Sequence, residues 1–271
     1  MNDRSVRILD LMKNNKNMKI TLLAELLDVS QVTLRRDLDN LENAGIVKRY
    51  HGYVSLDGAD DTSKRLAFFY LIKKRIAKAA SQMVEDGETI MLGSGTCCAL
   101  FAGELASTNR NITIITNSIY IANYLRKFNV KIILLGGFYQ PESQVLVGPI
   151  AAKHAREFYI EKFFLGTDGF VPDYGFTGGD CLRVETESGL VKCAEKVFIL
   201  TESAKFQRRG VYNMIQFSEV TEVITDDGIP KNAEDILVIN NIKLTKVPSA
   251  EERLKWCHLP GLPPILYKEK I

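Results

Sequence analysis

The sequence predicts an α/β protein in which a small, mainly helical N-terminal unit precedes a larger domain built on a doubly wound, mostly parallel sheet. Three features indicate this. A helix with start and stop signals occupies residues 31–44, a polar stretch follows at 57–63, and short apolar strands alternate with helices from residue 85 onward. The expected divisions are a first unit at 1–56, a linker at 57–64, an α/β domain at 65–247 and a C-terminal extension at 248–271.

Residues 22–44 predict two helices joined by a tight corner. Ser30 is a suitable N-cap, and Gly45 a suitable stop, for a helix over residues 31–44. A shorter helix over residues 22–27 precedes it, and Asp28-Val29 forms the corner. This is a helix-turn-helix, whose second helix fits the major groove of DNA. A further helix is expected at residues 4–14.

The second helix has an apolar and a polar face. Three leucines share one stripe at positions i, i+4 and i+7: Leu34, Leu38 and Leu41. At about 100° per residue, Arg36 points away from that stripe. The alternative is that Arg35 and Arg36 are only a solvated face, with Arg35 paired to Asp39.

Two short strand candidates, residues 46–49 and 54–56, flank the turn at 50–53 and make the motif a winged helix. Basic side chains at the wing suit phosphates or a minor groove. The residues expected to contact DNA are Ser30, Gln31, Thr33, Arg35, Arg36, Asn40, Lys48, Arg49 and His51.

The α/β domain begins with residues 65–84, which predict one long basic amphipathic helix with Ile72, Ile76 and Ala80 facing inward. Its lysines at 73, 74 and 78 are expected on a solvated surface, and contact with DNA is the alternative. The strands are then expected at 89–92, 112–115, 130–135, 162–165, 197–200, 222–225 and 236–238. The helices between them are expected at 97–106, 119–127, 150–158 and 183–194.

Composition is ordinary for a soluble globular protein, with 46% hydrophobic and 25% charged residues. The net charge of +2 equals the excess of nine Lys/Arg over seven Asp/Glu within residues 1–56. No apolar run reaches 18 residues and no signal peptide is evident, so a cytoplasmic location is expected. Five cysteines without Cys-x-x-Cys spacing predict free thiols, and three scattered histidines indicate no metal site.

Ligands of open α/β sheets bind at the carboxyl ends of the strands. Five successive strand ends carry glycine, hydroxyl, amide, carboxylate or ammonium groups, and this set suits a small phosphorylated polyol. The anion is expected at the Gly93–Thr96 loop, the hydroxyls at Asp168 and Asn117, and a counter-charge at Lys205. The candidate ligand-binding residues are Gly93, Ser94, Gly95, Thr96, Cys97, Asn117, Ser118, Gly136, Gly137, Gly166, Thr167, Asp168, Gly169 and Lys205.

Other interpretations of these loops stay open. A Gly-Ser-Gly turn is often purely structural, and Asp168 and Lys205 could simply pair with each other. The domain could also be a phosphosugar isomerase or lyase with a DNA-binding arm, using Asp168, Asp180 or Glu185 as a base. The adjacent Cys97 and Cys98 at a helix N-terminus suggest either ordinary packing or a redox-sensitive pair, because that position lowers a thiol pKa.

The pattern Leu-Ala-x-x-Leu-x-Val-Ser-x-x-Thr-x-Arg-Arg-Asp-Leu at residues 23–38, followed by Gly45 and Arg49-x-His51-Gly52, resembles the DeoR family of bacterial transcriptional regulators. The loops after the strands resemble the C-terminal domain of that family, which is similar to ribose-5-phosphate isomerase. The resemblance covers residues 4 to about 247 and departs from the family pattern at Tyr53, Cys97 and residues 201–203.

The resemblance implies a non-enzymatic regulator without a cofactor. We expect a repressor of a carbohydrate-utilisation operon that leaves double-stranded operator DNA when a phosphorylated sugar or polyol binds. An activator is the alternative, and the sequence does not separate the two. A homodimer or homotetramer is expected, because paired recognition helices read half-sites about 34–36 Å apart.

Overall fold

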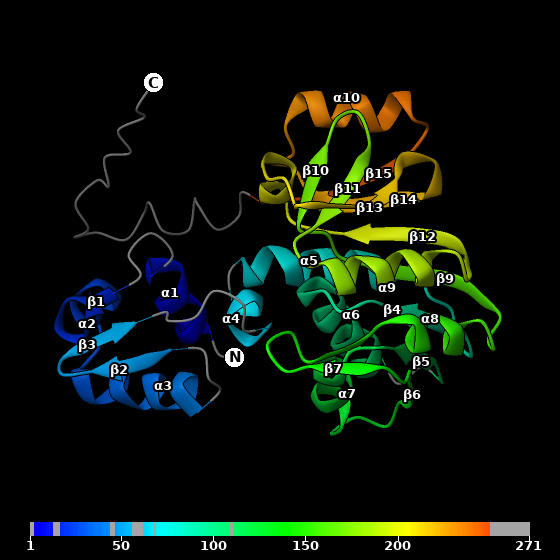
Figure 1. Ribbon diagram of the computed structural model, residues 1–271. Helices are drawn as coiled ribbons and strands as arrows, with labels where there is room; N and C mark the ends of the chain where they lie inside the picture. Colours follow the sequence, from blue (N-terminus) through cyan, green and yellow to red (C-terminus); the bar gives the residue numbers. More distant parts are fainter. Residues whose placement is uncertain are drawn as a thin grey trace.

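The computed structural model describes residues 3–12, 17–43, 47–55, 62–67, 69–108 and 111–249 (Figure 1). The predicted stop at Gly45, most of the linker at 57–64 and the extension from residue 250 lie outside these ranges. None of the described helices has the length and apolar character needed to cross a membrane. Within the described ranges, no group of His, Cys, Asp and Glu side chains is arranged to hold a metal ion.

The N-terminal unit contains three helices and a small antiparallel sheet. The helices are α1 (Asp3–Met12), α2 (Ile20–Leu27) and α3 (Gln31–Asn43). The strands are β1 (Asn17–Lys19), β2 (Lys48–Tyr50) and β3 (Tyr53–Ser55), in the order β1-β3-β2. The predicted winged helix-turn-helix is therefore confirmed, and β1 is a strand that the sequence pattern did not reveal. Its three residues are too few to show the alternation from which strands are predicted.

Leucines on one face of α3 hold this unit together. Leu34 and Leu38 are fully buried and pack in one cluster with Ile8 of α1, Leu23 of α2 and Val54 of β3. The corner between α2 and α3 is set by Asp28, whose φ of 51° lies in the left-handed region that Asp tolerates. The apolar stripe thus fixes which face of α3 remains outside.

The larger unit is built on a seven-stranded sheet of order β15-β14-β12-β9-β4-β5-β6, in which every pair is parallel. Its strands are β4 (Thr89–Leu92), β5 (Thr113–Thr116), β6 (Lys131–Leu134), β9 (Ile160–Leu165), β12 (Ala194–Leu200), β14 (Glu222–Asp226) and β15 (Lys243–Val247). Six of the seven predicted strands are confirmed. The predicted strand at 236–238 is wrong, because these residues lie in helix α10 (Lys231–Ile239) and the last strand is β15.

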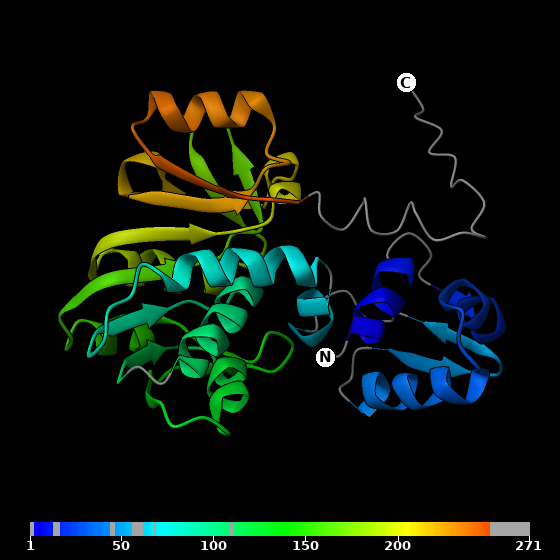
Figure 2. The same ribbon diagram turned by 180° about the vertical axis from the view of Figure 1, so that it is seen from behind.

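Helices cover both faces of the sheet (Figure 2). Along β4, Ile90 and Leu92 belong to one core cluster, whereas Met91 belongs to the other. The first cluster receives side chains from α5 (Tyr70–Ser81), α6 (Thr96–Ser107) and α7 (Ile119–Leu125). The second receives them from α8 (Pro149–Ala155), α9 (Cys181–Val191) and α10. The domain is therefore doubly wound, as predicted.

The single long helix predicted at 65–84 is wrong. The chain forms a short helix α4 (Thr62–Ala67) and then α5, and Phe69 between them has a φ of 56°. A left-handed residue cannot continue a right-handed helix, so the two helices point in different directions. The inward placement of Ile76 and Ala80 is confirmed, but Lys73, expected on a solvated surface, is buried.

Two small antiparallel sheets were also not evident from the sequence. One joins β10 (Gly169–Val171), β11 (Gly175–Gly178) and β13 (Tyr212–Gln216), and the other pairs β7 (Phe138–Gln140) with β8 (Val145–Val147). Gly175, with a φ of 141°, starts β11 where a Cβ atom would lie 2.3 Å from the Ile215 carbonyl oxygen. The 3-10 helices η1 (Ser203–Gln207) and η2 (Phe217–Glu219) complete the described elements.

Candidate functional site

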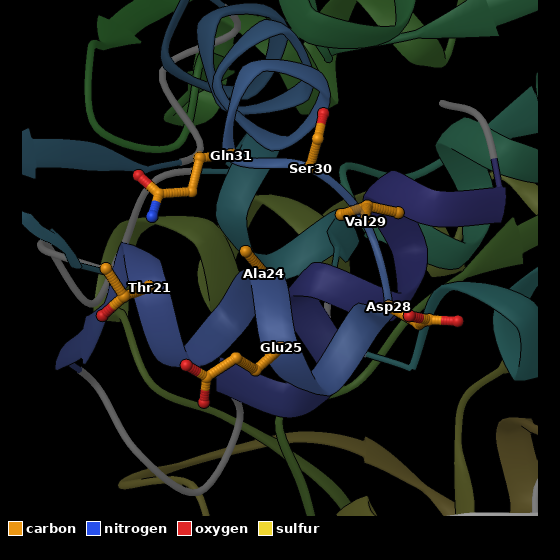
Figure 3. Close-up of a pocket in the computed structure, with 7 residues that line it drawn as sticks. All are labelled: Thr21, Ala24, Glu25, Asp28, Val29, Ser30 and Gln31. Atoms are coloured by element: carbon orange, nitrogen blue, oxygen red, sulfur yellow. The ribbon is translucent and has the colours of Figure 1, made fainter.

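Helix α3 presents a polar face that the structure leaves exposed. Ser30 caps the helix, since its Oγ accepts a hydrogen bond from the Thr33 N–H at 3.2 Å. Gln31, Arg35, Arg36 and Asn40 are exposed, and Arg36 lies opposite the buried leucine stripe. A shallow hollow of about 370 Å³ lies at the corner between α2 and α3, and Figure 3 shows Ser30 and Gln31 on its rim. The start of the candidate recognition helix is therefore accessible.

Asp37 stands beside Arg36 in the chain but has a structural position. Its carboxylate is buried and accepts two hydrogen bonds from Arg4 of α1, one of them from Nη2 to Oδ1 at 3.2 Å. This ion pair ties α3 to α1. Asp37 therefore orients the helix, whereas its neighbour Arg36 remains exposed and available for contacts outside it.

The wing is fastened to α3 through Arg49. Its backbone N–H and its Nε both donate to the Glu42 carboxylate, at 2.8 and 2.7 Å, and its Nη2 lies 2.6 Å from Asp39. Hydrogen bonds from Arg49 lower the pKa of Glu42. Asp39 therefore pairs with Arg49 of the wing, and not with Arg35, the partner that the solvated-face interpretation offered. Lys48 and His51 are exposed on the wing.

A cavity of about 380 Å³ lies beside the carboxyl ends of β4, β9 and β12. It is lined by eight of the predicted ligand-binding residues: Ser94, Gly95, Thr96, Cys97, Gly166, Thr167, Asp168 and Lys205. These come from three of the five loops that the sequence singled out. The N-terminus of α6 opens at Gly95, which places its unpaired N–H groups at the cavity wall.

The other six predicted residues do not line this cavity and hold loops together instead. The Gly93 N–H donates to the Phe164 carbonyl oxygen, and the Asn117 amide donates to that of Leu146. Ser118 caps α7. Gly136 donates to His154 at 3.4 Å, Gly137 packs against Val147, and Gly169 begins β10. The structure thus separates the amide at Asn117 from the carboxylate at Asp168, which were expected to share a ligand.

The structure adds charged residues to the cavity that the sequence analysis missed. They are Arg65, Lys73, Arg183, Glu187, Glu202 and Arg208, and Asp180, considered from sequence only as a base, lines the cavity as well. For Lys73 a signal existed, because it precedes the buried Ile76 and Ala80 by three and seven residues and so falls within the apolar stripe of α5. Arg65, Arg183, Glu187 and Arg208 come from segments whose approach to the cavity depends on tertiary structure, whereas Glu202 stands in the same strand-end loop as Lys205.

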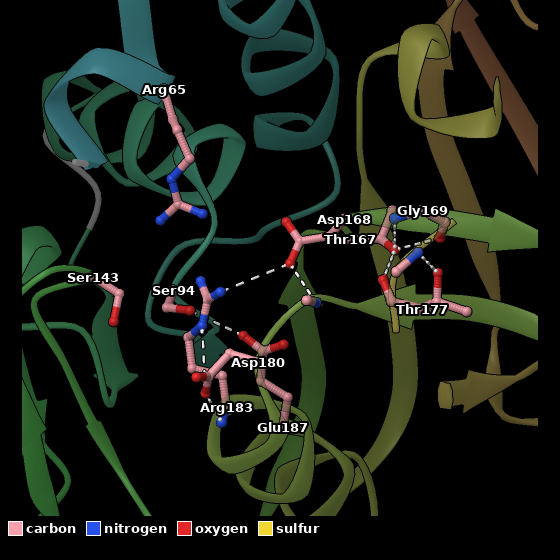
Figure 4. A network of polar contacts seen from close by, with 12 residues as sticks. Arg65, Ser94, Ser143, Thr167, Asp168, Gly169, Thr177, Asp180, Arg183 and Glu187 are labelled. Atoms are coloured by element: carbon pink, nitrogen blue, oxygen red, sulfur yellow. Dashed lines mark hydrogen bonds and ion pairs between the residues drawn. The ribbon is translucent and has the colours of Figure 1, made fainter. Parts of the chain in front are cut away.

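Asp168 lies at the centre of a polar network (Figure 4). Its carboxylate lies 3.7 Å from Lys205 Nζ and 3.9 Å from Arg183 Nη2, and it accepts a 3.0 Å hydrogen bond from the Gly179 N–H. Burial raises the pKa of Asp168, but Lys205, the Gly179 N–H and Arg183 together outweigh it, so the pKa is lowered. Asp168 is therefore ionised at neutral pH.

Two further titratable groups in the cavity are buried. The Lys73 ammonium donates to the Arg65 carbonyl oxygen, and burial lowers its pKa against the opposing effect of Glu202. Glu187 accepts a 3.0 Å hydrogen bond from Ser94 Oγ, and burial raises its pKa to about 7. The cavity thus contains both cations and carboxyl groups, and one carboxyl is poised between its two protonation states.

Cys97 and Cys98 are both buried at the start of α6. Burial raises the pKa of each thiol, most strongly for Cys97, which also lies near Glu202. The lowered pKa on which the redox interpretation depended is therefore wrong. Both side chains pack in the core cluster on the α6 face of the sheet.

Family models match both units of the chain. The DeoR-like helix-turn-helix domain matches residues 4–58, and the DeoR C-terminal sensor domain matches residues 70–227. Among solved structures, ribose 5-phosphate isomerase A from Methanocaldococcus jannaschii has a TM-score of 0.38 and 20% identity, covering 51% of this chain and 54% of its own.

Curated relatives match over most of their length. The L-fucose operon activator of Escherichia coli K12 is 29% identical over 83% of this chain and 94% of that protein. The glycerol-3-phosphate regulon repressor of the same strain is 27% identical over 88% and 95%. A putative aga operon transcriptional repressor of Escherichia coli O157:H7 is 26% identical over 85% and 88%. With both family models placed in order along one chain, the protein belongs to the DeoR family of DNA-binding transcriptional regulators.

Proposed function

We propose that this regulator is a repressor of a carbohydrate-utilisation operon and that a phosphorylated sugar or polyol releases it from DNA. One observation carries the proposal: a single cavity combines an anion-binding wall with carboxyl groups suited to hydroxyls. The wall comprises Lys73, Lys205 and the N-terminus of α6, and the carboxyl groups include Asp168 and Glu187. A phosphate ester needs the anion-binding wall, and the hydroxyl groups of a polyol chain need the carboxyl groups.

The relatives support a carbohydrate effector, because the names of three of them refer to the fucose operon, the glycerol-3-phosphate regulon and the aga operon. Two of these are repressors and one is an activator, so repression is the more frequent sign among them. The proposed regulator has no catalytic activity. It acts as a homodimer or homotetramer, because two recognition helices are needed to read two half-sites.

On the DNA side, we assign base reading to the exposed face of α3 and phosphate contact to the wing. Gln31, Arg36 and Asn40 project from α3, and Lys48 and His51 project from the wing. Arg49 supports the wing through Glu42 and Asp39. Arginine and asparagine are side chains that read guanine and adenine in the major groove, so the face has suitable chemistry.

The testing experiment measures binding to DNA from upstream of the protein's own gene and of neighbouring carbohydrate genes. The complex is titrated with a panel of sugar and polyol phosphates and with the unphosphorylated compounds. Release by one phosphorylated compound alone is expected, and Lys205→Gln should weaken that response while leaving DNA binding intact. Specific DNA binding that no compound changes would overturn the effector half of the proposal.

One observation favours a second candidate, a phosphosugar isomerase-like enzyme. Glu187 has a pKa near 7 in the same cavity as Lys205, as a general base would need. Of the bases considered from sequence, Asp180 caps α9 and lines the cavity, whereas Glu185 is exposed and does not. Turnover of pentose or hexose phosphates that is lost in Glu187→Gln would establish the enzyme. No turnover at high protein concentration would eliminate it.

A further inference from the structure

Helix α4 lies between the two family modules and belongs to neither. The helix-turn-helix match ends at residue 58 and the sensor match begins at residue 70, whereas α4 spans Thr62–Ala67. It is the first described element after the wing strand β3. Arg65 of this helix nevertheless lines the sensor cavity. A segment outside both matched modules therefore contributes to the candidate effector site.

Two hydrogen bonds attach α4 to the sensor domain. Thr62 Oγ1 donates to the Ser143 carbonyl oxygen at 3.0 Å, in the turn between β7 and β8. The Lys73 ammonium of α5 donates to the carbonyl oxygen of Arg65. Leu66 is buried in the core cluster on the α5 and α6 face. The position of α4 is thus set by groups at or next to the cavity.

The hydrogen-bonding groups of the Arg65 side chain are incompletely satisfied by the described protein groups. Its Nε atom is buried without a hydrogen-bond partner, and its Nη2 makes only a long contact of 3.4 Å to Thr62 Oγ1. No carboxylate of the described residues forms an ion pair with it. Figure 4 shows its guanidinium on the same side of α4 as Ser94 and Arg183. A buried donor without a protein partner is energetically costly, and an oxyanion in the cavity would complete its hydrogen bonding.

We propose that Arg65 binds the anionic group of the effector and that, through this contact, occupancy of the cavity fixes α4, the first described element after the DNA-binding unit. The inference rests on the proposed function and names the residue through which that site is regulated. The guanidinium is suited to this role, because its planar array of donors binds two oxygens of one phosphate at once.

A second chain of contacts leads from the cavity to the same point. Asp180 at the cavity wall accepts a 3.2 Å hydrogen bond from the Gln140 side chain, whose Oε1 in turn accepts one from Ser143 Oγ. Ser143 is the residue whose carbonyl holds Thr62. Ligand contacts on the α9 side of the cavity therefore also reach α4. Both chains of contacts, the one through Arg65 and the one through Asp180, therefore end at α4.

The first arm of the test compares effector affinity in Arg65→Gln with that of the wild-type protein. Calorimetry on the full chain uses glycerol 3-phosphate, ribose 5-phosphate and galactose 6-phosphate as probes. Arg65→Gln is expected to weaken binding of the best probe about tenfold or more, the loss typical of a hydrogen-bonded charge pair. Arg126→Gln, which changes an exposed arginine that does not line the cavity, should stay within about twofold.

The second arm separates binding from transmission. Thr62→Val keeps the shape of a residue that does not line the cavity but removes the hydroxyl that donates to Ser143 and accepts the long 3.4 Å contact from Arg65. We expect its probe affinity within about threefold of wild type, and a smaller probe-induced change in DNA affinity at saturation. Arg65→Lys keeps the positive charge but lacks the planar array of donors, so it should bind the best probe with intermediate affinity. This variant tests the assignment of Arg65 even if Arg65→Gln does not fold.

The outcomes distinguish the two proposals. Unchanged probe affinity in Arg65→Gln, with normal binding in wild type, would overturn the assignment of Arg65 and leave the proposed function standing. Weak binding in Arg65→Gln with full DNA release in Thr62→Val would overturn the role of α4 in transmission. If no probe binds the wild-type protein and none alters its DNA complex, the proposed effector class is wrong, and the inference fails with it.

Discussion

Glu187 is a carboxyl group whose burial makes the stability of the sensor domain depend on pH. Its pKa in the folded protein is about 7, above the ordinary 4.5. A raised pKa means that the folded state holds the proton more tightly than the unfolded state does. The stabilisation is therefore fully present below about pH 4.5 and is lost as pH rises through about 7.

Glu187→Gln should remove this dependence, because the amide oxygen can still accept the hydrogen bond from Ser94 but carries no charge. We expect the variant to be more stable than wild type at pH 8.5, by up to about 3 kcal/mol, and the difference to shrink toward pH 5.5. Urea unfolding at both pH values measures it. Glu185→Gln, an exposed carboxylate on the same helix, is the control. Equal pH dependence in Glu187→Gln and wild type would contradict the prediction.

Arg36 is the side chain on which sequence-specific DNA binding is expected to depend most. It is exposed on α3, while its neighbour Asp37 is buried against Arg4. Arg36→Ala should weaken specific DNA binding by about 1–3 kcal/mol and reduce discrimination between operator and unrelated DNA. Fluorescence anisotropy at fixed salt measures both, with Arg126→Ala in the sensor domain as the control. Unaltered affinity and preference would remove α3 from base reading.

At the scale of single residues, the sequence predicted the polar face of α3 better than the lining of the cavity. In a helix, the position of a residue in the sequence determines the face on which it lies, so the buried leucine stripe was enough to place Arg36 on the exposed face. Glycine, hydroxyl and amide groups, by contrast, occur both in loops that line the cavity and in loops that close turns. Thr96 and Ser118 each stand at the start of a helix, but only Thr96 lines the cavity. Three-dimensional proximity decides between them.

Among the elements, the wing combines two basic neighbours with different surroundings. Lys48 is exposed, whereas the Arg49 guanidinium is held by Glu42 and Asp39. Lys48→Gln should reduce the slope of log affinity for DNA against log salt by about 1, the effect of one lost phosphate contact. Arg49→Gln should change the slope by less than about half of that. Titrations at four salt concentrations test this, and equal slope changes would show that Arg49 leaves Glu42 to contact DNA.

The elements that were predicted incorrectly share a physical cause. Residues 236–238 are a short apolar run that fits a buried strand or a helix equally well, and α10 uses it as a helix with Leu237 inside and Val238 outside. The break between α4 and α5 depends on the left-handed backbone of Phe69, a conformation unusual for a bulky residue. Neither feature has a glycine or proline to mark it. The central strands were predicted because they are short, apolar and separated by helices.

In the whole molecule, the apolar side chains form separate cores in the two units. The N-terminal cluster contains buried residues only between Ile8 and Val54, and the two clusters on the sheet contain them only from Leu66 to Val247. No buried cluster of the described residues includes members from both units. We propose that the units unfold independently, as a DNA-binding unit and a sensor unit that begins at α4.

Leu38→Ala tests this independence, because Leu38 is fully buried on α3 within the N-terminal cluster. A cavity at such a site costs about 2–5 kcal/mol. We expect the variant to lose DNA binding at a lower temperature while it binds a sugar phosphate with wild-type affinity. Leu237→Ala, equally buried on α10, should instead lower the unfolding temperature of the sensor unit. Calorimetry and hydrogen exchange distinguish the cases, and one shared transition shifted equally by both variants would show that the units unfold together.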